Sequence, residues 1–587
     1  MCAKEAPISG KRPAAGLIVA VALAATLAGL PAHAAQVTRS QRFVASDGVS
    51  LQTYVGGDGS LEPRPVIVEF SPYRPGCCPQ FAGPGYNYLQ VHIRGTGDSD
   101  GRFDSLGPRT QADVVEVLQW ACHQPWSNGT LGVFGFSASA ITFYNSLHLS
   151  LPCVKAAVMW SGTHELYRDL LLPGGIPNSL PGLGVLGLIG APALAATPAR
   201  IRRDPTETAS TVGGLVDAGS NAALHQTLDQ YWVERGMRGD VNHLPILVVD
   251  GFFDVESRGA FQTYQALRGD GAHLMVIGAH DGVPAGAEGI REAADAAWFD
   301  HYLRGIDNGI DAAPRVKLWL SDGDREDDLA GAFVRFDGTD WPIPGTRWES
   351  LSLDATPSGT ANSLNDGSLS LAAPAARTTQ SYPTIPSLPN ASDQPNTAIV
   401  GPNGVNALAT AVPQLTETTL AEHLGLSYTT RPLSGAVLAA GPMSLELVLS
   451  STATESDIWA VISDVSPDGV PHPVATGRLR TSYPFIDPAR SLSDPVTGDI
   501  VQPYGIYSSK TPAAIGEPRR YFVEFWPIGN RFKAEHRIRL DIVGVSAAST
   551  PAGVAVNTVA VGGAGGSRLL FPVLPGSDLA DALGSNG

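Results

Sequence analysis

The stretch Gly132-Val133-Phe134-Gly135-Phe136-Ser137-Ala138 is an apolar segment that runs into a serine flanked by small and apolar residues. This pattern predicts a strand followed by a sharp turn, with the serine at the tip and a helix directly after it. A glycine suits position 135, because a side chain there would strike that helix. The turn would leave the Ser137 hydroxyl exposed and aim the Ala138 N–H into the same space, where it can stabilise an oxyanion.

Apolar strand-like segments alternate with helix-like segments on both sides of this turn. Strands are expected at residues 66–70, 89–93, 129–136, 154–159, 244–249 and 274–277, and the clearest helix at residues 111–120. Strands that are apolar at most positions are typical of sheets that are buried on both faces. The alternation therefore predicts an α/β fold with a doubly wound, mostly parallel sheet over residues 35–312.

Two segments depart from this alternation. Residues 163–242 lack a strand pattern and, at roughly 80 residues, are too long for a simple loop, so they predict an inserted helical cap. From residue 313 to residue 587, short strand-like runs recur between turn residues, at 316–320, 351–353, 445–450, 458–462, 521–525 and 537–543. Many short strands without helices predict a C-terminal all-β domain, a β-sandwich or jelly roll.

A serine becomes a strong nucleophile only beside a base that a carboxylate orients. Asp254 follows the strand expected at 244–249, and His280 follows the strand expected at 274–277. Both therefore lie at the carboxyl ends of strands, where sites form in α/β sheets. The chain order serine, acid, histidine is that of α/β-hydrolases and predicts the triad Ser137, Asp254 and His280.

Other residues compete for these roles. Ser139 is a weaker nucleophile candidate, because the residue two positions before it is a serine and not a glycine. Asp250 competes for the role of the acid. His273 competes as the base, but it precedes its strand and so would lie at the opposite edge of the sheet. Asp281 is interpreted as a solvated loop residue.

The composition excludes several classes of protein. The chain has 65 Gly, 46 Pro and only 16% charged residues, which is incompatible with a coiled coil. Its 39 Lys and Arg against 56 Asp and Glu give a formal net charge of −17, whereas nucleic-acid binding needs clustered positive charge. The spacings typical of metal ligands are missing, so neither a metal nor a cofactor is expected.

The N-terminus has the three parts of a secretory signal. Lys4, Lys11 and Arg12 precede an uncharged, largely apolar run over residues 14–30, and Ala32-His33-Ala34 supplies small residues before a cleavage point at Ala35. An uncleaved anchor is the alternative, but the run is marginal for spanning ~30 Å of hydrocarbon. Residues 1–34 are therefore predicted to be a signal peptide, and the mature protein to be secreted or periplasmic without a membrane contact.

Export permits disulfides between the four cysteines that follow the signal. Cys122 ends an apparent helix over residues 112–121, and Cys153 precedes the strand expected at 154–159. Helix ends and strand beginnings share one edge of an α/β sheet, which predicts a bond between Cys122 and Cys153. Cys77 and Cys78 follow a strand at the opposite edge and either pair with each other or stay free.

Several further motifs resemble those of one enzyme family. The run Arg94-Gly95-Thr96-Gly97-Asp98-Ser99-Asp100-Gly101 is similar to the Arg-Gly-x-Gly-x-Ser-x-Gly segment of the cocaine esterase and X-Pro dipeptidyl-peptidase hydrolases. Further matches are Gln124-Pro125-Trp126-Ser127-Asn128-Gly129 and Trp298-Phe299-Asp300-His301-Tyr302-Leu303. In the C-terminal half, Gly441-Pro442-Met443 and His536-Arg537-Ile538-Arg539-Leu540 resemble the jelly roll of the family. The resemblance covers about residues 40 to 575.

The resemblance implies an α/β-hydrolase with a helical cap and a jelly roll that closes part of the active-site cleft. It places the triad on Ser137, Asp254 and His280, and it implies that Tyr73, after Ser71-Pro72, is a second oxyanion donor. The chain departs from the family at Ala138 and Ala140, where a tyrosine and a glycine are usual. The histidine loop, residues 278–282, also lacks the usual tryptophan.

Two carboxylates and one aromatic residue are candidates for substrate binding. Relatives that act on α-amino acid esters have acids near the positions of Asp169 and Glu256, and these hold the substrate ammonium group. The alternative interpretation is that Asp169 caps a helix and that Glu256 faces solvent or Arg258. Phe136, beside the nucleophile, is the third candidate.

The sequence thus predicts a serine hydrolase that cleaves ester or amide bonds in a small molecule or short peptide. An X-Pro dipeptidyl-peptidase, an α-amino acid ester hydrolase or an aminopeptidase is the alternative among enzymes. From another class, the chain would be a non-catalytic carbohydrate-binding protein. Neither the physiological substrate nor the oligomeric state can be read from the sequence.

Overall fold

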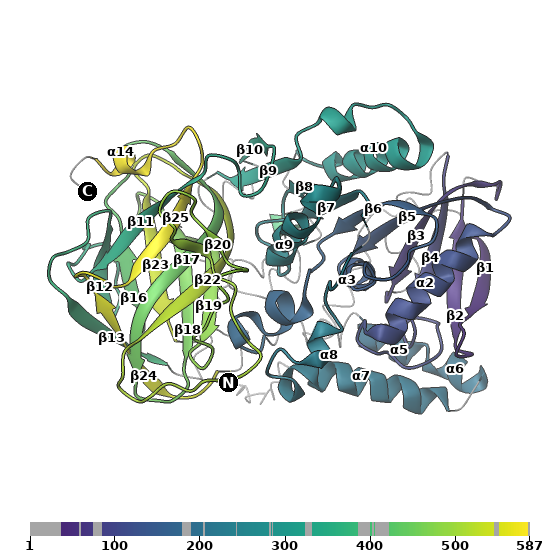
Figure 1. Ribbon diagram of the computed structural model, residues 1–587, viewed down its shortest axis with the longest axis horizontal. Helices are drawn as coiled ribbons and strands as arrows, with labels where there is room; N and C mark the ends of the chain where they lie inside the picture. Colours follow the sequence, from purple (N-terminus) through teal and green to yellow (C-terminus); the bar gives the residue numbers. More distant parts are fainter. Residues whose placement is uncertain are drawn as a thin grey trace, which may run out of the picture.

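The computed structural model has two halves that lie side by side, a mixed α/β half at the right of Figure 1 and an all-β half at the left. It describes residues 37–57, 60–73, 85–178, 189–203, 206–241, 243–280, 283, 286–322, 332–384, 400–401, 404–405, 422–544 and 551–584. The predicted signal peptide at residues 1–34, and Cys77 and Cys78, lie outside these ranges. Among the described residues, no helix is long and apolar enough to cross a membrane.

The α/β half is built on one sheet whose central strands are parallel. Its spatial order is β1-β2-β4-β3-β5-β6-β7-β8-β9-β10, with antiparallel pairs at both ends and parallel pairs from β4 to β9. The strands are β1 Val37–Val44, β2 Ser50–Gly56, β3 Arg64–Ser71, β4 Asn87–His92, β5 Ser127–Phe136, β6 Val154–Trp160, β7 Ile246–Asp250, β8 His273–Val276, β9 Val316–Ser321 and β10 Phe333–Gly338. The strands predicted for this half are thereby confirmed.

Helices cover this sheet on both faces, because its central strands carry apolar side chains in both directions. Helices α2 (Pro108–Cys122), α3 (Ala138–Tyr144) and α9 (Ser257–Leu267) pack on the face to which Val66 and Val68 point. Helix α10 (Ile290–Arg304) packs through Trp298 and Phe299 on the opposite face, against Ile67. The adjacent residues of β3 thus enter two different cores, as the alternation of side chains along a strand requires.

A helical segment is inserted between β6 and β7, as the sequence predicts. It contains η2 (Tyr167–Leu171), η3 (Pro173–Gly175), α5 (Ala191–Ala195), α6 (Thr197–Arg203), α7 (Glu207–Leu224) and α8 (Gln230–Val233). In Figure 1 its helices run along the lower side of the α/β half. Two of its segments also contact the C-terminal half, since η3 packs on β19 and the Leu228 N–H donates to the Tyr507 carbonyl.

The C-terminal half consists almost entirely of antiparallel strands, and its buried apolar side chains are continuous with the core on one face of the α/β sheet. The predicted all-β domain is confirmed. The long strand β17 pairs with β22, β24 and β25, while β23 pairs with β16 and β18. The elements are β11 Arg347–Asp354, β12 Asn365–Ser370, β13 Thr378–Thr384, β14 Val400–Gly401, β15 Gly404–Val405, β16 Leu426–Thr429, β17 Val437–Ser451, β18 Asp457–Val465, β19 Pro471–Arg480, β20 Leu492–Ser493, β21 Ile500–Gln502, β22 Arg519–Phe532, β23 Arg537–Val543, β24 Ala555–Val561, β25 Arg568–Val573 and the helix α14 Leu579–Leu583.

Strand β9 differs from the prediction in its partners. The sequence places residues 316–320 at the start of the all-β half, whereas β9 lies parallel to β8 and, with β10, extends the sheet of the α/β half. At its end, Ser321 also pairs with Asn530 of β22. The single strand β9 therefore joins both halves. A pattern of short strands in the sequence cannot reveal this, because the pairing partners of a strand lie far away in the chain.

The disulfide predicted between Cys122 and Cys153 is present. Cys122 is the last residue of α2, and Cys153 lies directly before β6. The bond therefore ties a covering helix to the sheet at the edge opposite the carboxyl ends of the strands.

Candidate active site

The turn between β5 and α3 holds Ser137 in a conformation that few residues adopt. Its φ is 54° and its ψ is −123°, and its N–H donates to the Trp160 carbonyl at 2.9 Å. A Cβ at Gly135 would lie 2.6 Å from the Ala140 Cα, so only glycine fits there, as predicted from the sequence. The next strand and the next helix thus both hold the serine in a strained turn, a feature that clusters at functional sites.

The departure from the family at Ala140 is accommodated by a second glycine. A Cβ at Gly162, just after β6, would come within 2.5 Å of the Ala140 Cβ. The methyl group of Ala140 therefore occupies space that Gly162 leaves open. The turn keeps its geometry because the small residue is Gly162, on the neighbouring segment, instead of a glycine at position 140.

The loops after β7 and β8 bring an acid and a histidine together. The Nδ1 atom of His280 lies 3.1 Å from each carboxylate oxygen of Asp254, which is fully buried. The Glu256 N–H donates to Asp254 Oδ1 at 2.8 Å, and the Ser161 hydroxyl donates to the His280 carbonyl at 2.6 Å. The ring of Phe136 lies against the His280 ring, with centroids 5.0 Å apart, so the imidazole is beside the residue that precedes Ser137.

Asp250, the competing acid, lies next to Asp254 in a different charge state. Burial raises the pKa of Asp250 well above its usual value, and the charge of Asp254 raises it further. Burial would also raise the pKa of Asp254, but the charge and hydrogen bond of His280 and a hydrogen bond from Asp250 outweigh it and lower that pKa. Asp250 is therefore neutral and donates to Asp254, which carries the charge beside the histidine.

The Ala138 N–H and the Tyr73 hydroxyl share one space in front of the turn. The N–H donates to the hydroxyl oxygen at 3.3 Å. Tyr73 follows β3 and Ala138 begins α3, so the two groups come from segments about 65 positions apart. A substrate oxygen between them would accept a hydrogen bond from each, the arrangement that stabilises an oxyanion.

The remaining competitors lie away from this space. Ser139 is buried below the turn, where its hydroxyl donates to Glu69 Oε1 at 3.3 Å. His273 begins β8 at the opposite edge of the sheet and packs against Trp298, and burial lowers its pKa to about 4. Asp281 lies outside the described residues.

Asp169 does not lie free to bind a substrate amine, which corrects one prediction. Its Oδ1 forms an ion pair with Arg258 Nη1, and its Oδ2 accepts from the Glu165 N–H at 2.8 Å and from the Thr163 hydroxyl at 2.5 Å. Its side chain is fully buried. The alternative of a helix cap is also wrong, since Asp169 lies inside η2. The positive charge that satisfies Asp169 comes from a helix 89 residues away, which sequence proximity cannot show.

Glu256 is buried and makes no ion pair with Arg258. Only 3% of it is exposed, and its Oε2 has no hydrogen-bond partner among the described residues. Burial raises its pKa well above the usual value, with the charges of Asp254 and Asp169 adding to the effect while that of His280 opposes it. Glu256 therefore lies beside the acid and the histidine as a neutral group, and not in solvent.

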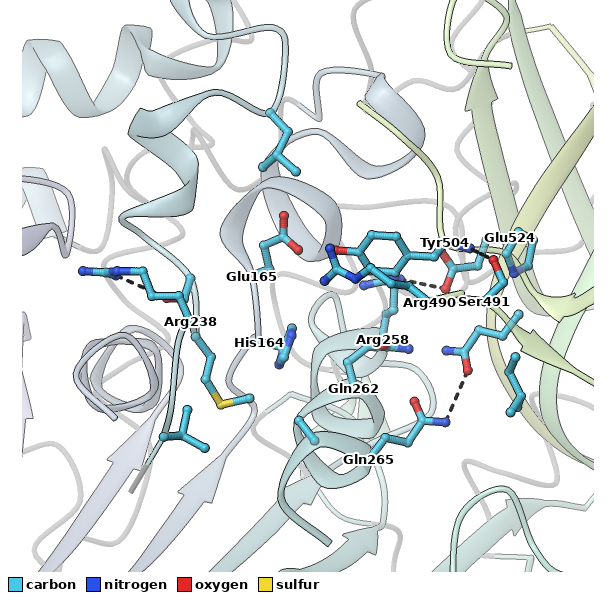
Figure 2. Close-up of a pocket in the computed structure, with 18 of the residues that line it drawn as sticks. His164, Glu165, Arg238, Arg258, Gln262, Gln265, Arg490, Ser491, Tyr504 and Glu524 are labelled. Carbon is cyan, nitrogen blue, oxygen red and sulfur yellow. Dashed lines mark hydrogen bonds and ion pairs between the residues drawn. The ribbon is translucent and has the colours of Figure 1, made fainter. Parts of the chain in front are cut away.

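A cavity of about 760 Å³ lies at the junction of the two halves, and Arg258 is one of its lining residues. In Figure 2, Arg258, Gln262 and Gln265 of α9 face Tyr504 and Glu524 of the C-terminal half across it. Within its lining, Glu524 bonds to Arg258 Nε at 3.0 Å, and Glu165 bonds to Arg168, outside the lining, at 3.0 Å. None of Ser137, Asp254, His280 and Tyr73 lines this cavity. It is therefore separate from the space in front of the turn.

The pairing of Arg258 with both Asp169 and Glu524 predicts a strong effect on stability. Arg258→Met is expected to lower the free energy of unfolding by about 3–5 kcal/mol, because two buried carboxylates lose their cation. A urea titration followed by tryptophan fluorescence measures the change. Arg335→Met is the matched control, since Arg335 forms an exposed ion pair with Asp337 and lies over the Trp319 ring, away from the buried pair. Equal transition midpoints for the two variants would contradict a structural role for the buried pair.

Glu69 is a site residue that the sequence analysis did not identify. It is fully buried in β3, below the turn, and contacts Tyr88, Gln90 and Ser139. The signal that could have marked it is a single charged residue inside an otherwise apolar strand.

Comparisons with known proteins match both halves of the chain. The family model for X-Pro dipeptidyl-peptidases of the S15 family matches residues 47–282, and the model for the X-Pro dipeptidyl-peptidase C-terminal non-catalytic domain matches residues 308–558. The cocaine esterase of Rhodococcus sp. (strain MB1 Bresler) is 25% identical over 69% of this chain and 74% of its own. A putative Xaa-Pro dipeptidyl-peptidase of Streptomyces avermitilis is 23% identical over 78% of this chain and 69% of its own.

Solved structures share the fold over nearly the whole chain. A CocE/NonD family hydrolase from Staphylococcus aureus superposes with a TM-score of 0.71 at 18% identity, over 91% of this chain and 93% of its own. An α-amino acid ester hydrolase superposes with a TM-score of 0.68 at 18% identity, over 91% of this chain and 96% of its own. Since consecutive family models match both halves in their order along the chain, the protein belongs to the CocE/NonD family of X-Pro dipeptidyl-peptidase-related serine hydrolases.

Proposed function

We propose that the protein is an extracytoplasmic hydrolase of carboxylic esters whose triad is Ser137, His280 and Asp254. The observation that carries the proposal is the contact of His280 Nδ1 with both oxygens of a buried, charged Asp254, beside the strained turn at Ser137. This contact leaves His280 Nε2 as the atom that can take a proton from the serine. Membership of a serine hydrolase family favours catalysis over a non-catalytic carbohydrate-binding role.

The reaction would proceed through an acyl-enzyme. His280 Nε2 accepts the proton as Ser137 Oγ attacks the ester carbonyl, and Asp254 orients the ring and stabilises the imidazolium. The Ala138 N–H and the Tyr73 hydroxyl hold the oxyanion of the tetrahedral intermediate. His280 then protonates the leaving alcohol. In the second half of the reaction it activates a water molecule that releases the acid.

We also propose a more detailed architecture for the two halves and a cellular location for the mature protein. The α/β half would be a doubly wound α/β-hydrolase sheet whose inserted helices form a cap, and the all-β half would be a jelly roll that closes part of the cleft. Helices on both faces of the sheet and contacts of η3 and Leu228 with the C-terminal half support this interpretation. Removal of the signal over residues 1–34 would deliver the mature chain to the periplasm or the exterior.

Charge in the site favours esters without a free amine. Asp169 is already paired with Arg258, and burial leaves Glu256 neutral, so no unpaired carboxylate among these candidates awaits an ammonium group. One observation supports the second candidate, an α-amino acid ester hydrolase or aminopeptidase. The Oε2 atom of Glu256 has no partner among the described residues, and a substrate ammonium group near it would favour its charged form.

A chromogenic panel separates the two candidates. We expect rapid hydrolysis of p-nitrophenyl butyrate, and no preference for alanyl-proline p-nitroanilide over its N-acetylated form. The reason is that a free ammonium group would enter a site without an unpaired anion. The measurement is kcat/KM for each substrate. A preference of about tenfold or more for the free amine, lost in Glu256→Gln, would instead establish the aminopeptidase activity.

A further inference from the structure

A carboxyl group that forms no ion pair with any described residue lies directly below the catalytic turn. Glu69 points out of β3 into a fully buried position, where Tyr88 donates to its Oε2 and Gln90 Nε2 donates to the same oxygen at 3.1 Å. Ser139 donates to its Oε1 at 3.3 Å. Among the residues that the structure describes, no lysine, arginine or histidine forms an ion pair with it. Burying a carboxyl group in this way is costly, which suggests a role beyond packing.

The contacts of Glu69 lead to both oxyanion donors. Ser139 is the second residue of α3 and follows Ala138, whose N–H is one donor. On the other side, the Ser71 hydroxyl hydrogen bonds to Glu69 and accepts from the Tyr73 N–H at 3.2 Å. One carboxyl group thus connects the start of α3 with the segment that carries the second donor.

We propose that Glu69 is a positioning residue that sets the separation of the Ala138 N–H and the Tyr73 hydroxyl. The proposal rests on the oxyanion site of the proposed function and assigns Glu69 no contact with substrate. Donors stabilise a transition state only when they are aimed beforehand at the place where charge develops. The hydroxyls of Ser71 and Ser139 both hydrogen bond to the buried carboxyl group of Glu69, and they thereby fix the positions of the two donors.

The charge state of Glu69 gives a second readout. Burial raises its pKa to about 7, although hydrogen bonds from Tyr88, Gln90, Ser139 and Ser71 oppose the shift. These groups face it from β4, from α3 and from β3 itself, and all of them are uncharged at neutral pH. A neutral Glu69 leaves the oxyanion undisturbed, whereas an ionised Glu69 places a like charge beneath it. Turnover should therefore decrease as pH rises through the pKa of Glu69.

A double-mutant cycle with Tyr73 tests the positioning role. Glu69→Ala is expected to lower kcat for p-nitrophenyl butyrate by about 10- to 100-fold with KM within about threefold, since only transition-state contacts are lost. In the Tyr73→Phe background the same substitution should cost less than about threefold, because the separation of the two donors no longer matters once the Tyr73 hydroxyl is gone. Losses that multiply in the double variant, or a rise in KM with kcat unchanged, would overturn the proposal.

Glu69→Gln keeps the shape of the side chain and removes its charge. It is expected to retain most of the wild-type kcat at pH 6 and to lose the decrease in kcat above pH 7, a change that a purely structural role would not produce. If Glu69→Ala does not fold, this pH profile decides the question, and a profile identical to that of the wild type would refute the proposal. Labelling of wild-type Ser137 by a fluorophosphonate probe distinguishes a failure of the proposed function from a failure of the proposed role of Glu69. Absent labelling would reject the proposed function itself, whereas labelling with an additive cycle rejects only the role of Glu69.

Discussion

Replacing Ser137 by alanine is expected to lower kcat/KM for p-nitrophenyl butyrate by about a million-fold, because the atom that forms the acyl-enzyme is removed. The folded state should be unchanged, since the hydroxyl lies at the tip of a turn that Gly135 and the Trp160 carbonyl hold through backbone contacts. Initial rates and the melting temperature measure the two effects. Labelling by a fluorophosphonate probe should disappear together with activity.

The control for this experiment is a second serine, Ser146, which lies close to Ser137 in the sequence. Ser146 lies just after α3, where its hydroxyl donates to the Thr142 carbonyl at 2.8 Å. Ser146→Ala should therefore keep both turnover and labelling. Turnover of Ser137→Ala above about 1% of the wild-type value, or labelling that persists, would show that another residue is the nucleophile.

Replacing Asp254 by asparagine should have the next largest effect, a decrease in kcat of about 10⁴-fold. The amide would donate to His280 Nδ1 and force the proton onto Nε2, where it blocks removal of the serine proton. Asp250→Asn should cost less than about tenfold, because an amide can still donate to Asp254 as the neutral Asp250 does. The measurement is kcat at pH 8 for both variants. Equal losses would show that the two acids act as one unit.

The same pair predicts a direction for stability against pH. The pKa of Asp254 is lower in the folded protein than in the unfolded chain, so its charge stabilises the fold at pH values above the unfolded pKa. This contribution is lost as the pH decreases through the folded pKa. Asp254→Asn should therefore reduce the difference in melting temperature between pH 6 and pH 3.

The elements that could be predicted from the sequence are those governed by neighbours along the chain. The turn at Ser137 is one, because the clash between residue 135 and the following helix involves atoms only five positions apart. The strands are another, since an apolar run of five or six residues requires burial on both faces wherever it lies. The disulfide could be predicted because the end of α2 and the start of β6 share one edge in any sheet of this kind.

The charges of the site could not be predicted in the same way. Asp169 was interpreted as a substrate ligand from the resemblance to relatives, or else as a helix cap. Its partner Arg258 instead comes from α9 and is shared with Glu524 of β22. The sequence predicts Asp254 as the acid but leaves Asp250 as a competitor. Only burial of both, with one histidine in reach of Asp254, makes one of them neutral and the other charged.

The sequence by itself therefore determined an α/β half with a serine turn, the chain order of serine, acid and histidine, and an all-β second half. These follow from sterics and hydrophobic patterning, which act over a few residues. The tertiary structure decided which acid carries the charge, which carboxylates are already satisfied, how β9 joins the halves, and that Glu69 hydrogen bonds to Ser139 and Ser71. Such outcomes depend on desolvation and on partners that the fold brings together from distant segments, and no local pattern encodes them.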